Sequence, residues 1–146
     1  MIRDAVLEDI PFIVEEGIKF LQYHPAKIER EVDVDHLHTL VNLLISEHVL
    51  LIAEQDGVQT GMIAGLIVPN MYNRNYVGLQ EMFWWVVEDK RNTPVAFKLY
   101  KTFEQTAKEL GVDFISMVTT TYTPTLEKYY KKQGFIPVES SFIKEL

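Results

Sequence analysis

Residues Gln80–Leu110 read QEMFWWVVEDKRNTPVAFKLYKTFEQTAKEL, and this stretch decides the fold. Its first eight residues are rich in aromatic and β-branched side chains and contain neither Gly nor Pro, which predicts a strand buried on both faces. A charged loop follows, and Thr93 and Pro94 then suit the N-cap and the first position of a helix. From Val95 onward, apolar residues recur at three- and four-residue spacing until Gly111 supplies a stop. The stretch therefore predicts a strand, a tight turn and a long helix.

The turn between this strand and this helix is a candidate anion-binding site. A helix N-terminus carries unpaired backbone N–H groups and the positive end of the helix dipole. Both face the mouth of the sheet, where they suit a phosphate-bearing ligand. We therefore expect the function at this junction.

The composition is that of one globular domain. The chain has 146 residues, of which 47% are hydrophobic and 24% charged, and we expect a single domain over residues 1–146. A net charge of −7 and a pI near 5.1 argue against nucleic-acid binding, which needs clustered Lys and Arg. The absence of cysteine excludes disulfides and thiolate chemistry. We expect a cytoplasmic protein without a membrane span, because no signal peptide and no apolar stretch of ~18 residues is present. The four histidines show no spacing typical of a metal site, so no metal is expected.

The rest of the chain predicts a mixed sheet flanked by helices. An Asp56-Gly57 turn joins two strands ahead of the central one. The strand after the long helix must run parallel to the central strand, because a helix crosses between them. The predicted elements, in order, are strand Ile2–Ala5, a helix capped by Asp9 that ends near Tyr23, helix Val34–Ser46, strands Val49–Glu54 and Gly61–Val68, loop Pro69–Gly78, the central strand and the long helix, strand Val112–Thr119, helix Leu126–Lys132 and strand Phe135–Ile143. This order indicates an α/β (α+β) fold with helices on both faces of the sheet.

Two segments carry a resemblance to a known family. They are Trp84–Ala96, which spans the strand, the turn and the start of the helix, and Tyr129–Phe135, which reads YYKKQGF. Together with the element order, they resemble the GNAT family of acetyl-coenzyme A-dependent N-acetyltransferases over nearly the whole chain. The resemblance implies the GNAT fold, in which the two parallel central strands splay apart, and it implies acetyl-CoA as cosubstrate.

The family's phosphate loop has the pattern Gln/Arg-x-x-Gly-x-Gly/Ala, and residues Arg91–Ala96 stand in its place. Pro94 replaces a glycine, and proline can neither donate a backbone hydrogen bond nor take a positive φ. The resemblance implies that the cofactor's diphosphate is held by the remaining N–H groups with added charge from Arg91, and its pantetheine arm by peptide groups of the central strand. The implied cofactor residues are Val86, Val87, Arg91, Asn92, Thr93, Val95, Ala96, Phe97 and Thr123, the last standing where the family has an asparagine.

The implied chemistry is direct attack of an amine on the thioester carbonyl, which needs a base for the amine and an acid for the departing thiolate. In the family, a tyrosine four residues before a Gly-Phe pair lies near the cofactor sulfur, and Tyr130 holds that place as candidate acid. Glu81, near the start of the central strand, is the candidate base. Each has a purely structural alternative: Tyr130 as a core aromatic with its hydroxyl at the surface, and Glu81 as a strand-end charge in solvent.

The resemblance also implies where an acceptor amine would bind. Such contacts come from the first two helices, the loop before the central strand and the chain end. The two tryptophans of the central strand point to opposite faces, so one of them could form a wall of the acceptor pocket. The implied residues are Phe20, Tyr23, His24, Tyr72, Asn73, Tyr76 and Trp84. Acidic residues at 29, 31, 33 and 35 are compatible with a cationic small-molecule or peptide amine, and equally with an ordinary soluble surface. A homodimer is compatible with the resemblance.

Two other functions remain open. With Pro94 in the phosphate loop, the chain could be a catalytically inactive GNAT-fold module that binds a protein partner through aromatics between residues 70 and 76. A nucleotide-phosphate-binding domain of another α/β family is less favoured, because no Gly-rich loop of Rossmann or P-loop form is present.

Overall fold

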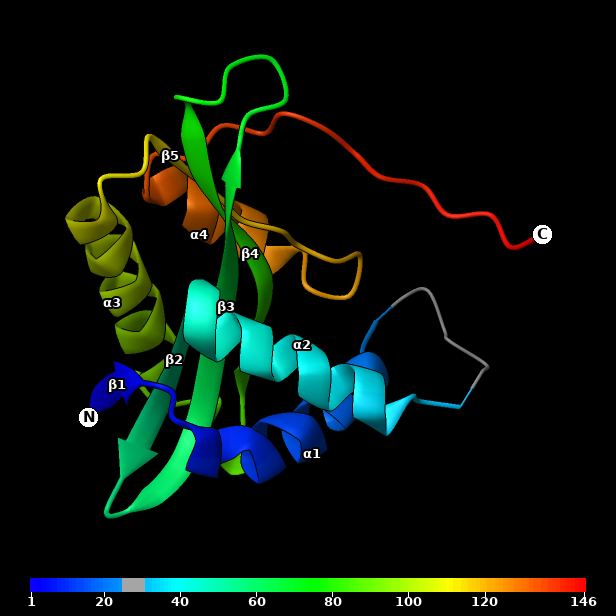
Figure 1. The fold of residues 1–146 in the computed structure, drawn as a ribbon, viewed down its shortest axis with the longest axis vertical. Helices are drawn as coiled ribbons and strands as arrows, with labels where there is room; N and C mark the ends of the chain where they lie inside the picture. The colour runs from blue at the N-terminus through cyan, green and yellow to red at the C-terminus, as the bar shows by residue number, and fades with distance from the viewer. Residues whose placement is uncertain (25–30) are drawn as a thin grey trace.

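The structure, a computed structural model, describes residues 1–24 and 31–146. Figure 1 shows a five-stranded sheet with helices packed against it. The elements are β1 (Ile2–Asp4), the 3-10 helix η1 (Leu7–Asp9), α1 (Ile10–Leu21), α2 (Val34–Glu47), β2 (Val49–Gln55), β3 (Val58–Pro69), β4 (Val77–Val86), the 3-10 helix η2 (Glu88–Lys90), α3 (Val95–Leu110), β5 (Phe114–Ser116) and α4 (Thr125–Lys132).

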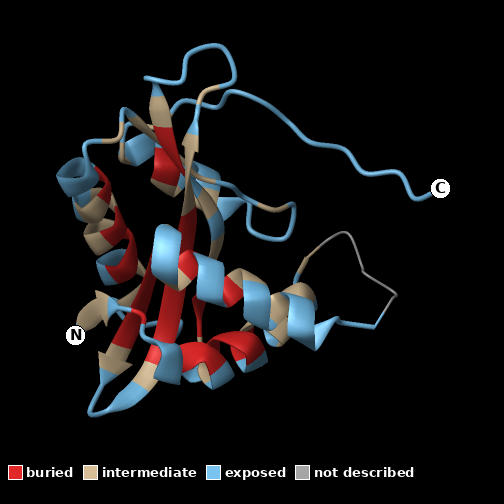
Figure 2. Ribbon diagram, viewed as in Figure 1, coloured by how far each residue is buried: buried red, intermediate tan, exposed pale blue. Residues whose placement is uncertain are grey.

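The sheet has the strand order β1-β2-β3-β4-β5, with antiparallel neighbours up to β4 and a parallel β4–β5 pair. One apolar cluster joins α1 and α2 to one face of the sheet, and a second joins α3 to the other face. Figure 2 shows the buried residues gathered in the strands and on the inner sides of the helices. The predicted mixed sheet with helices on both faces is confirmed.

The central strand β4 carries a β-bulge in its pairing with β3. Phe83 lies opposite Ala64 and Glu81 lies opposite Gly65, so Met82 is one residue too many for its partner strand. A bulge bends the strand that carries it. On its other side, β4 pairs with β5 only from Gly78 to Gln80. From Glu81 onward the parallel strands are no longer paired, which is the splay that the family resemblance implies.

The start of α3 differs from the prediction by one residue. The first helical carbonyl is that of Pro94, which accepts a hydrogen bond from the Lys98 N–H at 3.0 Å, so Pro94 is the N-cap and Val95 the first helical residue. Thr93 was expected to be the N-cap, and its hydroxyl accepts from the Val95 N–H only at 3.5 Å, which is a marginal distance.

The strand predicted at Phe135–Ile143 is not present, and this prediction was wrong. Residues 135–146 adopt neither helix nor strand, and in Figure 1 they run from the end of α4 to a terminus outside the body of the molecule. A strand is stable only when its backbone groups pair with a neighbour, and this segment pairs with no strand of the described chain. The strand predicted at Val112–Thr119 is likewise shortened to Phe114–Ser116.

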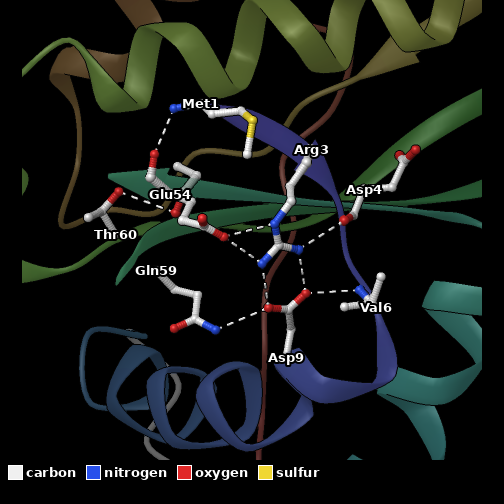
Figure 3. Close-up of polar contacts among 9 residues, drawn as sticks. Met1, Arg3, Asp4, Val6, Asp9, Glu54, Gln59 and Thr60 are labelled. Carbon is white, nitrogen blue, oxygen red and sulfur yellow. Dashed lines mark hydrogen bonds and ion pairs between the residues drawn. The ribbon is translucent and has the colours of Figure 1, made fainter. Parts of the chain in front are cut away.

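A partly buried ion pair holds β1 to the start of α1 (Figure 3). The Arg3 guanidinium donates to both carboxylate oxygens of Asp9, at 2.7 and 2.9 Å, and its Nε donates to Glu54 on β2 at 2.9 Å. Asp9 also accepts from the Val6 N–H and from Gln59 on β3. The Asp9 side chain was predicted to cap the helix; it stands at the N-cap position but bonds to Arg3 and Val6 instead. The hydrogen bonds from Arg3 lower the pKa of Asp9 to about 2, against the opposing effect of burial.

Replacing Asp9 with Asn is expected to destabilise the fold by about 2 kcal/mol at pH 7, because the buried side chain loses its charge-assisted bonds from Arg3, which is partly exposed and keeps Glu54 as an ion-pair partner. A lowered pKa means that the ionised Asp9 stabilises the fold above its ordinary pKa of 3.8 and loses this effect as the pH falls toward 2. The difference from wild type should therefore shrink between pH 4 and pH 2, as measured by urea unfolding. The exposed neighbour Asp4→Asn is the control, with an expected change within about 0.5 kcal/mol. An equal loss at pH 7 and pH 2 would show that the charge is not the cause.

Candidate active site

The structure brings the two predicted catalytic residues together on one peptide group. Glu81 lies on β4 just before the bulge, Tyr130 lies in α4, and Val118 lies in the loop that follows β5. The Val118 N–H donates to Glu81 Oε2 at 2.9 Å, and the Tyr130 hydroxyl donates to the Val118 carbonyl at 2.9 Å. A carboxylate and a phenol therefore flank the point where the parallel strands part.

The Glu81 carboxyl is suited to take up a proton near neutral pH. Its side chain is half-buried and lies four residues into β4, not at a strand end in solvent. Burial raises the pKa of Glu81 to about 7, with the hydrogen bond from Val118 acting in the opposite direction. Both protonation states are then populated at pH 7, which is the condition that favours general acid–base catalysis.

The Tyr130 hydroxyl remains protonated at neutral pH. The ring is buried against Trp84 and Phe135, with ring centres 6.5 and 5.6 Å away. Burial raises the pKa of this phenol above its ordinary value, and the nearby Glu81 charge adds to the effect. The hydroxyl donates to the Val118 carbonyl rather than to solvent, so Tyr130 is a core aromatic whose O–H group is held in one direction.

The N-terminus of α3 leaves backbone donors available beside a hollow of about 540 Å³. In a helix whose first residue is Val95, the N–H groups of residues 95, 96 and 97 have no intrahelical acceptor. The Thr93 N–H, by contrast, donates to the Lys90 carbonyl at 3.1 Å. Lys98 adds a positive charge to the wall of this hollow, which Glu54 and Asp56 line on the other side. Sequence reasoning missed Lys98; its position one turn into the helix was the available signal. Asn92 and Phe97 are both exposed at this end.

Arg91 does not lie on the α3 N-terminus in this structure. Its Nε donates to the Val86 carbonyl at 3.1 Å, and its guanidinium carbon lies 4.4 Å from the Trp85 ring centre and 4.9 Å from that of Tyr23. The Val87 N–H donates to Thr60 on β3, so the neighbouring Val86 points its N–H and C=O toward the gap between β4 and β5. Two peptide groups, those of Val86 and Val87, were predicted to bind the pantetheine arm. Only that of Val86 faces the gap, and its carbonyl already accepts a hydrogen bond from Arg91.

Trp85 joins the aromatic residues at the end of α1. Its ring centre lies 5.9 Å from that of Phe20 and 5.3 Å from that of Tyr23. Its Nε1–H donates to the buried Glu16 carboxylate at 2.7 Å, which also accepts from Lys19 at 2.6 Å. Glu16, Lys19, Tyr23 and Trp85 are among the residues that line a second hollow, of about 310 Å³. Glu16 was missed by sequence reasoning; a charge on the apolar face of the first helix was its signal.

Trp84 lies on the opposite face, under α3 and α4. Its ring centre is 6.1 Å from that of Tyr100 and 6.2 Å from that of Tyr129. Trp84 is therefore beside Tyr130, whereas Trp85 is the tryptophan next to Phe20 and Tyr23. The Nε1–H of Trp84 and the hydroxyls of Tyr100 and Tyr129 are buried without a hydrogen-bond partner among the described residues.

The other predicted acceptor residues do not form one group. Tyr76 packs against Phe114 with ring centres 5.0 Å apart, and Tyr72 and Asn73 are exposed in the β3–β4 loop. This loop lies at the far end of β4 from Trp85, about 30 Å along an extended strand. His24 follows the end of α1 and is half-buried.

Polar residues of two further loops have local roles. Thr123 sits in a cluster of hydroxyls with Thr119 and Thr120 before α4. Asp33 caps α2 by accepting from the His36 N–H at 2.9 Å. Residues 31 and 35 are exposed, and residue 29, which was part of the same acidic run, lies outside the described residues.

Two further kinds of site concern residues 1–24 and 31–146. No group of three or more His, Asp or Glu side chains is arranged to hold a metal ion there. In the same part of the chain, no helix is both long and apolar enough to cross a membrane.

Comparison with known proteins identifies relatives of this architecture. The model of the acetyltransferase (GNAT) family matches residues 18–135. No curated protein sequence matches the chain. The ribosomal-protein-alanine N-acetyltransferase of Brucella melitensis biovar Abortus 2308 superposes with a TM-score of 0.75 at 17% identity, over 100% of this chain and 99% of that one.

Two further solved structures have the same fold. A predicted acetyltransferase with acetyl-CoA from Clostridium acetobutylicum gives a TM-score of 0.76 at 20% identity, over 99% of this chain and 95% of that one. An aminoglycoside acetyltransferase from an uncultured soil metagenomic sample, in complex with sisomicin, gives 0.76 at 13% identity, over 100% and 95%. Identities this low show a shared fold.

Proposed function

Because this chain belongs to the acetyltransferase (GNAT) family, we propose that it is an acetyl-CoA-dependent N-acetyltransferase that acts on a primary amine. The observation that carries the proposal is the pair formed by Glu81 and Tyr130 on either side of the Val118 peptide, where β4 and β5 part. The pair supplies a group that accepts a proton near pH 7 and a group that holds one.

In the proposed reaction, Glu81 takes the proton that an ammonium acceptor must lose before its nitrogen can attack the thioester carbonyl. A nitrogen–carbon bond forms, and the carbon–sulfur bond then breaks. Tyr130 gives its proton to the departing thiolate. The attacking nitrogen then loses its second proton, which restores the Tyr130 phenol, and Glu81 releases the first proton to solvent. Ammonium and thioester thus give an amide, a thiol and one proton.

The N-terminus of α3 is the proposed site of the cofactor's diphosphate. The N–H groups of Val95, Ala96 and Phe97 and the charge of Lys98 suit an anion. Asn92 and Thr93 directly precede this helix N-terminus, and they and Thr123, in the hydroxyl cluster before α4, are further proposed cofactor contacts. The Val86 peptide is the proposed hydrogen-bond partner of the pantetheine arm. For this contact to form, Arg91 must release the Val86 carbonyl, and its guanidinium could then move toward the diphosphate.

The proposed acceptor is a small-molecule or peptide amine. Phe20, Tyr23 and Trp85 form a cluster of rings, and Glu16 places a buried carboxylate beside it. Aromatic faces and carboxylates attract organic cations. His24, at the end of α1, is a further proposed acceptor contact. Trp84 lies on the opposite face of β4 from this ring cluster, so its proposed contact is with the reacting end of the acceptor, beside Tyr130. Tyr72 and Tyr76, at the far end of β4, suit only an extended acceptor. A cytoplasmic location is part of the same proposal.

A second function, a catalytically inactive GNAT-fold module that binds a protein, is favoured by one observation. Arg91 donates a hydrogen bond to the Val86 carbonyl, and Pro94 has no backbone N–H to offer a phosphate at this turn. If Arg91 does not move, the pantetheine arm loses its partner.

Titration calorimetry with acetyl-CoA separates the two functions. The enzyme is expected to bind with a Kd in the micromolar range, and Lys98→Met to weaken binding by about fivefold, because one partly screened charge near a phosphate contributes about 1 kcal/mol. Lys108→Met, near the other end of α3, is the matched control and should bind like wild type. Absence of binding at millimolar acetyl-CoA would favour the inactive module.

A further inference from the structure

Arg91 lies over two aromatic rings of the proposed acceptor site. Its guanidinium carbon is 4.4 Å from the Trp85 ring centre and 4.9 Å from that of Tyr23, and the two ring centres are 5.3 Å apart. A cation within about 6 Å of a ring centre is attracted by the ring's π electrons. Trp85, Tyr23 and the buried Glu16 beside them, here called the cage, therefore already hold a cation that the chain itself provides.

Arg91 is held in the cage without an ion pair. Among the described residues, its one side-chain hydrogen bond runs from Nε to the Val86 carbonyl, at 3.1 Å. In residues 1–24 and 31–146, no carboxylate forms an ion pair with Arg91, although Glu16, Glu88 and Asp89 line the same hollow. The Arg91 residue is also exposed, and ring contacts of an exposed cation are weak. Arg91 can therefore leave the cage without stranding a buried charge.

The hollow becomes acidic when Arg91 leaves it. Three carboxylates line it, those of Glu16, Glu88 and Asp89, together with the two cations Lys19 and Arg91. Without Arg91, three negative charges stand against one positive charge. A cleft lined by one sign of charge raises the local concentration of the opposite ion. The vacated cage thus favours a cation from solution.

The cage prefers a guanidinium to an ammonium. Lys19 offers an ammonium in the same hollow, and its Nζ donates to the carboxylates of Glu15 and Glu16, at 2.9 and 2.6 Å. The rings instead contact the guanidinium of Arg91. A guanidinium is planar and weakly hydrated and stacks on aromatic faces, whereas an ammonium is compact and strongly hydrated. Arg91 therefore indicates the type of ligand that the cage accepts.

We propose that the cage binds a guanidinium group of the acceptor, and that Arg91 occupies this position until the cofactor is bound. Guanidinium binding rests on the geometry of the cage, while its role in acceptor recognition rests on the proposed function. Arg91 donates to the carbonyl proposed for the pantetheine arm and lies four residues before the first residue of α3. A cofactor that takes this carbonyl and attracts Arg91 to its diphosphate empties the cage for the acceptor.

The position of the cage also sets the size of the acceptor. Trp85 lies four residues after Glu81 on β4, which is about 13 Å along an extended strand. An acceptor whose amine reaches Glu81 while its guanidinium lies in the cage must span this distance. The acceptor class is thus an extended amine with a guanidinium at its far end.

Methylguanidinium tests the cage without acetyl transfer. The probe is titrated into ¹⁵N-labelled protein, and the two tryptophan indole N–H signals are followed by NMR. Arg91→Ala is expected to bind it roughly tenfold or more tightly than wild type, because the internal competitor is gone, with a shift of the Trp85 signal and not of the Trp84 signal. Lys90→Ala removes a neighbouring charge but no ring contact, and this matched control should bind like wild type.

Three results of this titration would overturn the proposal. They are equal affinity in Arg91→Ala and wild type, equal gains in the Arg91 and Lys90 variants, and a shift of the Trp84 signal alone. Methylammonium is the second probe, and binding to Arg91→Ala as tight as that of methylguanidinium would overturn the preference for a guanidinium.

Tyr23→Ala, made in the Arg91→Ala chain, tests the ring itself. It is expected to weaken methylguanidinium binding about threefold, which is the contribution of one cation–ring contact at an exposed site. Tyr23 leaves 45% of its surface exposed, so the circular dichroism spectrum should not change. Tyr122→Ala, at a tyrosine that is 58% exposed before α4, is the matched control and should bind like its parent. Unchanged affinity in the Tyr23 variant would contradict a cage built on this ring.

Kinetics separates the acceptor role from the proposed function. The substrates are a tetrapeptide amide of three glycines and a C-terminal arginine, and the same peptide with citrulline, an uncharged analogue of arginine. The arginine peptide is expected to have a kcat/KM roughly tenfold higher, and Tyr23→Ala to remove most of this difference. Equal rates for the two peptides would overturn the acceptor role and leave the acetyltransferase standing. Guanidinium binding without acetylation of any amine would overturn the proposed function, and the acceptor role with it, but not the cage.

Discussion

Glu81→Gln is expected to lower kcat/KM for amine acetylation by about 10²- to 10⁴-fold, because the variant keeps the shape of Glu81 but cannot accept a proton. In wild type, kcat/KM should rise with pH through about 7, where Glu81 becomes ionised. The variant should lose this limb of the profile. The measurement is kcat/KM from pH 5.5 to 9, with the exposed Glu47→Gln as the control. Unchanged rates in Glu81→Gln across this range would remove Glu81 as the base.

The same variant should gain stability at high pH. Burial raises the pKa of Glu81 from 4.5 to about 7, so the folded protein holds this proton more tightly than the unfolded chain does. The stabilising effect of the protonated group is complete below pH 4.5 and is lost as the pH rises through 7. Gln stays neutral, and its oxygen can still accept from the Val118 N–H. Urea unfolding should therefore find Glu81→Gln more stable than wild type at pH 8 and no different at pH 4. A purely structural carboxylate would give a less stable variant at pH 8.

Tyr130→Phe is expected to lower kcat by about 10²- to 10³-fold with little change in KM, because the departing thiolate loses its acid while both substrates keep their sites. The lost hydrogen bond to Val118 should also lower stability by about 1 kcal/mol. These effects are measured by steady-state kinetics at saturating acetyl-CoA and by urea unfolding.

The neighbouring Tyr129→Phe is the matched control. The Tyr129 hydroxyl is buried without a hydrogen-bond partner among the described residues, so its removal should leave kcat unchanged and stability equal or slightly higher. If both variants retained full activity, Tyr130 would be a core aromatic and no more.

The sequence predicts those elements whose packing partners lie close along the chain. Helix α3 was predicted within one residue, because its apolar spacing and Gly111 define it locally. The β2–β3 hairpin follows from its Asp56-Gly57 turn, where both residues have positive φ. Residues 135–146 do not meet this condition: their pattern indicates a strand, but a strand also needs a neighbouring strand to pair with, and a linear pattern does not show one.

The site is predicted less well, because its details depend on contacts between distant residues. Tyr130 was proposed from a motif and Glu81 from its place on the central strand of the family, but their shared contact with the Val118 peptide was not predicted. The position of Arg91 over Trp85 depends on α1 packing beside β4. The bulge at Met82 matters as much, because it shifts the alternation of β4. Counted from Leu79 without it, the two tryptophans would exchange faces.

The bulge also equips the protein with two optical probes. The chain has two tryptophans, and they report on opposite sides of β4: Trp84 among tyrosines beside α4, and Trp85 under the guanidinium of Arg91. In a Trp85→Phe chain, intrinsic fluorescence would follow events on the α3–α4 side. In a Trp84→Phe chain, it would follow the departure of Arg91 from its ring. Intrinsic fluorescence of these two chains could thus follow the binding of cofactor and acceptor separately, without an attached dye.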